Sequence, residues 1–238
     1  MMSVRSFVRS RGALDLVATV LMIAASVGLL WRTFFKATTS PRPSAIAVAA
    51  NRIQIADGYV MGSSTAKYGM VEFADFECPF CGDFARDIFP RLKAQYIDTG
   101  RVRFAFRHLP LSNHSYAANA AALTDCAARE NQFWPMHDRL FSRPLDLSHK
   151  RILAHAASLD INRDRFNRCV ADQAGMARVN LDLAAAKALG LSSTPTFVFG
   201  VLDQAGTLTI ESAVMGIGSE EDFSNLLNDI MARHEGIR

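Results

Sequence analysis

The 238-residue sequence has little glycine and proline, and it shows neither internal repeats nor low-complexity tracts. Its 14 Gly and 8 Pro exclude a collagen-like fibre, which needs glycine at every third position. Hydrophobic residues make up 50% of the chain and charged residues 21%, so intrinsic disorder is excluded as a description of the whole chain. The length suits one domain with additional segments, or at most two small domains.

The sequence also lacks a basic region that would suit nucleic acid outside its N-terminal segment. The net charge is +3, but residues 1–50 carry six basic side chains against the single Asp15, a balance of +5. The remaining residues carry 20 basic and 22 acidic side chains, a balance of −2. Because the positive charge belongs to the N-terminus, we expect no nucleic-acid partner.

An apolar run near the N-terminus indicates a membrane segment. Residues 13–35 are long enough to span a bilayer, with residues 1–12 then in the cytoplasm and residues 36–50 forming a Thr-, Ser-, Pro- and Ala-rich linker. A cleavable signal needs a small-x-small site directly after its apolar core, whereas Trp31 and Arg32 follow here. These flanks favour an uncleaved anchor, and a cleaved signal is the alternative.

Only four cysteines occur, and two of them form the sequence Cys-Pro-Phe-Cys at residues 78–81. An apolar strand pattern over 68–76 precedes this motif, and an apolar pattern with helical spacing follows it to Gly100. Cys78 is therefore expected at a helix N-terminus, where unpaired backbone N–H groups and the helix dipole stabilise a thiolate. Cys81, one turn further, is in place to resolve a mixed disulfide.

Two neighbours of the cysteines have candidate supporting roles. Pro79 suits the first helical turn, since its missing N–H costs nothing there. Glu72 lies six residues before Cys78 on the predicted strand, from which its carboxylate can take a proton from the more buried Cys81. A solvated strand residue is an equally good interpretation of Glu72.

Zinc binding is the main alternative interpretation of the cysteines. It requires Cys126 and Cys169 as further ligands, but neither belongs to a second Cys-x-x-Cys pair and both lie far along the chain. A plain structural disulfide between Cys78 and Cys81 is a second alternative. The strand–motif–helix arrangement favours a redox-active pair, and no metal or cofactor is expected.

The rest of the chain predicts an α/β fold with a helical insertion. An alternating pattern over 101–108 indicates a second strand. A hairpin over 196–199 and 207–210 and a final helix from 219 to about 234 follow later. Between them lie helical patterns over 115–130, 132–141, 148–158, 162–171 and 174–189. We therefore expect a domain over 51–238 with a helical subdomain at about 112–190.

The sequence resembles the DsbA-like branch of the thioredoxin superfamily, the thiol:disulfide oxidoreductases of the bacterial envelope. The resemblance covers residues 68–230 and rests on four segments in order. These are 71–81 (VEFADFECPFC), 106–111 (FRHLPL), Cys126 with 133–141 (FWPMHDRLF), and 193–197 (STPTF). It implies a thioredoxin fold with an inserted helical subdomain, preceded by the N-terminal membrane helix or signal.

The resemblance also assigns roles to individual residues. Cys78 matches the attacking cysteine and Cys81 the resolving one, while Thr194 and Pro195 match a cis-proline loop that faces the disulfide and pairs with extended substrates. Cys126 and Cys169 match positions that form a second disulfide in some members, with two buried free thiols as the alternative. Phe80 departs from the Pro-His dipeptide of the best-known oxidases, and it offers no hydrogen bond or charge to the thiolate.

The resemblance implies a protein disulfide oxidoreductase in the cell envelope. Its expected partners are extended or unfolded thiol-containing proteins, a membrane redox partner that the sequence does not identify, and the cytoplasmic membrane through the anchor. The catalytic domain would lie in the periplasm or outside the cell, with secretion after signal cleavage as the alternative. We expect oxidative disulfide formation, and a reductase or isomerase of the same fold is the alternative that Phe80 keeps open.

Overall fold

The computed structural model describes Met22, residues 43–142 and residues 146–236. The described residues from 43 onward belong to one compact unit. The cytoplasmic segment expected over 1–12 lies outside the described residues, as does all of the anchor or signal expected over 13–35 except Met22. Within the described ranges, no helix combines the length and the apolar character that crossing a bilayer requires.

A mixed seven-stranded sheet forms the centre of the domain, with β4 (Tyr68–Ala74) and β5 (Val102–His108) lying parallel side by side. On the other edge of β4, β6 (Thr196–Leu202) runs antiparallel to it, and β7 (Thr207–Met215) runs antiparallel to β6. The two strands and the hairpin predicted from apolar patterns are therefore confirmed. β4 is central, and all seven of its residues are buried because both faces of the sheet are covered.

Three short strands near the N-terminus complete the sheet, and no sequence pattern predicted them. β3 (Tyr59–Met61) pairs with β5, and β2 (Arg52–Gln54) pairs with β7. β1 (Ser44–Ala45), which falls within the linker expected over 36–50, also pairs with β7. Strands of two or three residues are too short to show an alternation, and their pairing partners lie far away in the sequence.

The helix expected after the cysteine motif consists of four consecutive helical segments of alternating type. α2 (Pro79–Asp83) is followed by a π-helical turn η2 (Phe84–Ile88), by α3 (Phe89–Leu92) and by a second π-helical turn η3 (Lys93–Ile97). Pro90 lies in the first turn of α3, the part of a helix that best tolerates its missing N–H. The widened π-helical turns on either side of α3 were not expected from the sequence.

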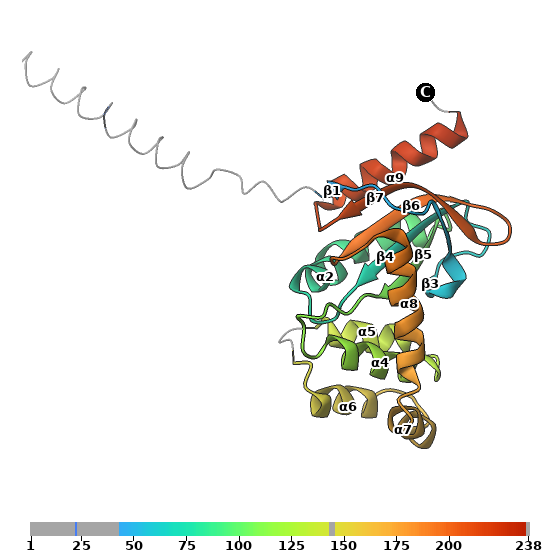
Figure 1. Cartoon of the computed structure of the whole chain (residues 1–238). Coiled ribbons are helices and arrows are strands. Elements are labelled where there is room, and N and C mark those ends of the chain that lie inside the picture. Colours follow the sequence, from blue (N-terminus) through green and yellow to red (C-terminus); the bar gives the residue numbers. More distant parts are fainter. Residues whose placement is uncertain (1–21, 23–42, 143–145, 237–238) are drawn as a thin grey trace, which may run out of the picture. The chain divides into compact units, whose positions relative to one another are not determined.

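The helical insertion lies between β5 and β6, in agreement with the subdomain expected at about 112–190, and its described residues form five helices. Figure 1 shows these helices gathered at one end of the sheet, with α8 leading back to it. Their bounds are α4 Ala117–Ala128, α5 Phe133–Leu140, α6 His149–Ala157, α7 Arg163–Ala171 and α8 Gly175–Leu189. Gly175 permits close packing, because a Cβ there would lie 2.1 Å from the carbonyl oxygen of Ala122 on α4.

The last helix, α9 (Glu220–Glu235), covers the same face of the sheet as the α2–η3 segment. Ser219 and Asp222 form a capping box at its start, which satisfies the first backbone N–H groups. Its buried residues Phe223 and Leu227 join Phe84 and Phe197 in one aromatic-rich core. This core packs the segment that begins with α2 against the sheet, and it therefore anchors the cysteine motif near the end of β4.

Candidate redox site

The cysteine motif begins where β4 ends. Cys78 is the N-cap residue of α2, and its extended backbone allows its carbonyl to accept from the Gly82 N–H at 3.2 Å. Pro79 occupies the first helical position, as the sequence predicted. Both cysteines are free thiols, Cys78 4% exposed and Cys81 completely buried. The arrangement leaves Cys78 as the sulfur nearer to solvent.

The environment of Cys78 favours its thiolate. A hydrogen bond from the Cys81 thiol lowers the pKa of Cys78, and burial opposes this effect. Interactions with Thr194 and with the backbone N–H groups of Cys81 and Phe80 lower it further, to about 6. A pKa near 6 leaves most of the thiol ionised at neutral pH. Cys78 can therefore act as a nucleophile and as a leaving group.

Cys81 has the opposite tendency. Its complete burial, reinforced by the hydrogen bond to Cys78 and by the charges of Cys78 and Glu72, raises the pKa of Cys81 well above the ordinary value. Burial also raises the pKa of Glu72, and the Cys78 charge adds to this effect. Glu72 is 2% exposed, so the interpretation of it as a solvated strand residue is wrong. Its Oε1 has no hydrogen-bond partner among the described residues.

The loop before β6 faces Cys78. The Thr194–Pro195 peptide bond is cis, and the Cys78 thiol donates to the carbonyl oxygen of Thr194 over 3.4 Å. The Gly216 N–H donates to the Pro195 carbonyl at 2.8 Å, which attaches the loop to the end of β7. Two segments more than one hundred residues apart in the sequence thus meet at one sulfur atom.

Phe80, between the cysteines, is 52% exposed and makes no polar contact with either sulfur through its side chain. Tyr116 and Met215 are further large side chains that remain exposed. Both lie near this end of the domain, because the Tyr116 N–H donates to Glu77 and Met215 pairs with Thr196. Exposed aromatic and thioether groups of this kind suit contact with apolar segments of another protein.

Two residues of the site were not singled out by the sequence. Asp75 is 2% exposed and binds the loop after β5, accepting from the Leu111 N–H and from His114 Nδ1, each at 2.8 Å. The imidazole of His114 is thereby held against a buried carboxylate. The signal available was an acidic residue at the end of a strongly apolar strand, three residues before Cys78.

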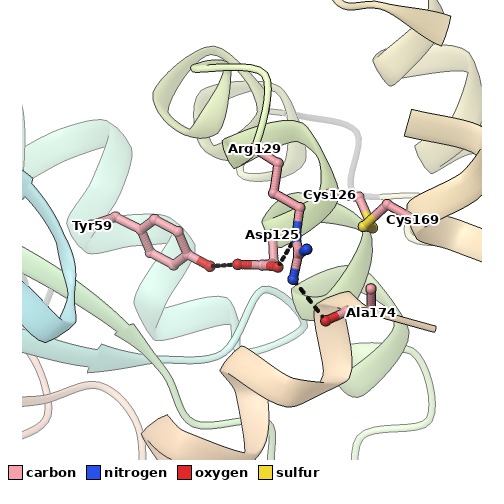
Figure 2. The surroundings of a disulfide bond; sticks show 6 residues. All are labelled: Tyr59, Asp125, Cys126, Arg129, Cys169 and Ala174. Atoms are coloured by element: carbon pink, nitrogen blue, oxygen red, sulfur yellow. Dashed lines mark hydrogen bonds and ion pairs between the residues drawn. A yellow bond between two sulfur atoms is a disulfide. The ribbon is translucent and has the colours of Figure 1, made fainter. Parts of the chain in front are cut away.

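Cys126 and Cys169 form a disulfide that joins α4 to α7, with a Cα–Cα distance of 5.7 Å. Figure 2 shows the polar groups beside it: Tyr59 donates to Asp125 at 2.8 Å, and Arg129 binds Asp125 and the Ala174 carbonyl. The disulfide removes two of the four thiolates that a zinc site would need. Within the described ranges, no group of three or more His, Cys, Asp or Glu side chains is arranged to hold a metal ion.

Comparison with known proteins identifies the fold. Residues 55–214, more than half of the chain, match the family model described as Thioredoxin, and the chain belongs to that family. Alpha-DsbA1 of Wolbachia pipientis is 27% identical, with a TM-score of 0.64, and the match covers 74% of this chain and 92% of that chain. BdbD of Bacillus subtilis is 21% identical with a TM-score of 0.60, covering 80% of this chain and 96% of that one, which supports the fold alone. Within the superfamily the protein is DsbA-like.

Similar sequences also occur within longer proteins. The Na(+)/H(+) antiporter NhaA 3 of Salinispora tropica is 37% identical over 155 residues, which are 65% of this chain and 23% of that protein. NhaA 1 of Salinispora arenicola is 34% identical over 162 residues, 68% of this chain and 24% of that protein. The chain thus spans about a quarter of the length of these curated relatives, and the antiport in their names describes the longer proteins.

Proposed function

We propose that the protein exchanges disulfides with extracytoplasmic proteins through Cys78 and Cys81, and that it acts chiefly as an oxidant. The observation that carries the proposal is the opposite shift of the two thiols, with the pKa of Cys78 lowered to about 6 and that of Cys81 raised. A pair of this kind has one sulfur for substrates and one for resolution.

The oxidative reaction proceeds in two exchanges. A substrate thiolate attacks Cys78 Sγ of the Cys78–Cys81 disulfide, and Cys81 leaves with the electron pair of the broken bond. A second thiolate of the substrate then attacks the substrate sulfur of the mixed disulfide, and Cys78 leaves as its stabilised thiolate. The substrate gains a disulfide, and the protein gains two electrons.

Glu72 serves the proton transfer at the buried sulfur. When Cys81 leaves, its thiolate is completely buried. Burial disfavours the charged form, so protonation of the Cys81 sulfur is strongly favoured. Glu72 lies in the same buried environment, which raises the pKa of its carboxyl well above the ordinary value and suits it to carry the proton. In the reverse reaction the carboxylate accepts the proton from Cys81.

Thr194, Pro195 and Phe80 provide the contact with the substrate. The Thr194 backbone lies beside Cys78, where an extended peptide can add to it as a strand. The exposed Phe80 ring offers an apolar surface at the entrance. Both features suit an unfolded chain rather than a folded surface.

The direction follows from which redox form is stabilised. A stabilised Cys78 thiolate favours the reduced protein and therefore makes the disulfide form an oxidant. The Phe80 side chain gives no polar support, so the protein is a weaker oxidant than members with His at that position. Reduction or isomerisation by the same pair is the second function that Phe80 favours.

The remaining parts of the proposal concern location. An envelope protein held in the cytoplasmic membrane by residues 13–35, with its domain in the periplasm or outside, would meet newly exported chains; secretion after cleavage is the alternative. A membrane redox partner would reoxidise the Cys78–Cys81 pair after each turnover. The Cys126–Cys169 disulfide supports a compartment where disulfides persist.

The test is oxidation of a reduced, unfolded model protein by the purified domain in its disulfide form. The wild-type domain should form disulfides stoichiometrically, Cys78→Ser should form none, and Cys81→Ser should accumulate a mixed disulfide with the substrate. The Cys126→Ala/Cys169→Ala variant controls for the second disulfide and should retain the reaction. Unchanged oxidation by Cys78→Ser would overturn the proposed function.

A further inference from the structure

His114 lies in the loop between β5 and α4, and neither exchange step described above uses it. Its Nδ1 is 2.8 Å from Asp75 Oδ2. The His114 side chain is 20% exposed, whereas that of Asp75 is fully buried. A partly exposed imidazole is thus anchored on a buried carboxylate that belongs to the cysteine loop.

Asp75 connects His114 directly to the backbone of the nucleophile. Its backbone carbonyl accepts from the Cys78 N–H at 3.1 Å, while its carboxylate accepts from the Glu77 and Leu111 N–H groups and from His114. Because one residue holds both groups, the position of the imidazole relative to Cys78 is fixed by short hydrogen bonds. No long flexible side chain intervenes.

The charged groups that act on His114 are Asp75, Glu77 and Cys78, and all three are anionic when ionised. Glu77 is itself held in place, since its Oε2 accepts from the Tyr116 N–H at 2.7 Å. Partial burial lowers the pKa of His114, but the hydrogen bond to Asp75 and the three negative charges outweigh it and raise the pKa overall. The imidazole is therefore a cation over a wider pH range than an isolated histidine.

We propose that His114 is a positioning residue of the redox site, which stabilises the Cys78 thiolate by holding a positive charge beside it on the Asp75 carboxylate. This charge comes from the loop after β5, and it replaces the one that Phe80 cannot supply from within the motif. The inference rests on the proposed role of Cys78 as the reactive thiolate. A histidine that only fastened the loop to Asp75 would have no effect on the sulfur.

The first test compares three variants of the purified domain. His114→Gln keeps a side-chain N–H for Asp75 without the charge, His114→Lys keeps a charge, and His149→Gln removes an exposed histidine from the start of α6 as a control. The readouts are the Cys78 pKa, from the ultraviolet absorbance of the thiolate, and the equilibrium constant with glutathione.

His114→Gln should raise the Cys78 pKa and make the disulfide form about tenfold less oxidising, a fall of about 30 mV in the two-electron potential. His114→Lys should restore most of both values, and His149→Gln should change neither. If His114→Gln folds and leaves both readouts at their wild-type values, the proposal is wrong. If instead wild-type Cys78 titrates as an ordinary thiol, the proposed function itself fails.

A second measurement needs no variant at the site. Electrostatic coupling is reciprocal, so a Cys78 thiolate must raise the pKa of His114 by the same factor that His114 lowers the pKa of Cys78. Histidine resonances followed by NMR should show a His114 pKa higher by about one unit in the reduced protein than in the disulfide form. Equal values in the two forms would overturn the proposal.

Discussion

Cys78 and Thr194, 116 residues apart in the sequence, meet with the cysteine Sγ 3.4 Å from the threonine carbonyl oxygen. The contact joins the end of β4 to the start of β6, which are neighbours in the sheet. A substrate that pairs with the Thr194 backbone therefore passes directly over the reactive sulfur. The chemistry of the site depends on this juxtaposition together with the unequal pKa values of the two thiols.

The lowered pKa of Cys78 predicts a specific pH dependence of stability in the reduced protein. The folded-state pKa of about 6 lies below the ordinary value of 9.0, so ionisation stabilises the fold fully above pH 9 and loses this contribution as pH falls through 6. The disulfide form has no such titration. Urea unfolding of both forms should therefore show the free-energy advantage of the reduced form shrinking from pH 9 to pH 6.

A constant difference between the two forms over this range would contradict the assigned ionisation. The alkylation rate of the reduced protein provides a check on the same group, because only the thiolate reacts. It should rise to a plateau with a midpoint near pH 6, and Cys78→Ser should remove this phase.

Replacing Phe80 should tune the oxidising strength. Phe80→His places a donor and a partial charge next to Cys78, which should lower its pKa further and make the protein more oxidising by about tenfold or more in the glutathione equilibrium. Phe80→Leu is the matched control, since it removes the ring without adding polarity. If the His and Leu variants have the same equilibrium constant, residue 80 does not act on the thiolate.

Glu72→Gln should separate catalysis from stability. It removes the buried proton carrier, so the step in which Cys81 leaves or attacks should slow by about tenfold or more. Because burial raises the pKa of Glu72, ionising this carboxyl destabilises the fold above its unfolded pKa, and the Gln variant should be at least as stable at neutral pH. Stopped-flow exchange rates and urea unfolding test the two parts.

Glu221→Gln, on the exposed first turn of α9, is the control for losing one carboxylate and should leave the exchange rate unchanged. A Glu72→Gln variant that exchanges at the wild-type rate would exclude the proton-transfer role. A variant that is slower and also much less stable would show that Glu72 is needed for the structure instead.

The Cys126–Cys169 disulfide should contribute stability without taking part in exchange. It closes a loop with a sequence separation of 43, for which the chain-entropy relation gives about 4 kcal/mol. The Cys126→Ala/Cys169→Ala variant should lose free energy of unfolding of this order in denaturant titrations while retaining the Cys78 thiolate. Loss of the thiolate in a folded double variant would indicate that the disulfide supports the site.

The polar contacts around that disulfide give a related prediction. Tyr59→Phe leaves the largely buried Asp125 Oδ1 without its donor, which should cost about 1–3 kcal/mol of unfolding free energy. Tyr116→Phe is the control, because Tyr116 is 49% exposed and its ring remains in place. Equal stability of the two variants would mean that the Tyr59 hydroxyl contributes nothing net.

The sequence predicted the site to the extent that its groups lie close together along the chain. Cys78, Pro79 and Cys81 occupy one motif between a recognisable strand and helix, and their placement at the N-terminus of α2 agrees with that pattern. Thr194 and Pro195 came from the family resemblance, since no local pattern places them beside Cys78. His114 was missed because its contact with Asp75 forms only when the chain folds.

The errors in the fold have a similar physical origin. The strands over 44–61 are too short for a periodic signal and are stabilised by pairing with β5 and β7, so they were not predicted. The sequence left Glu72 open between a proton carrier and a solvated strand residue, because only the covering of both sheet faces buries it. Long helices such as α8 and α9 were predicted nearly to their ends.

The central claim is that Cys78 and Cys81 form a redox-active pair, and the reduction potential of that pair in a glutathione buffer tests it most directly. We predict a value between about −120 mV, that of strong oxidants of this fold, and about −270 mV, that of its reductants. Phe80 should keep it from the oxidising extreme. A potential below about −300 mV, typical of structural disulfides, would contradict the account.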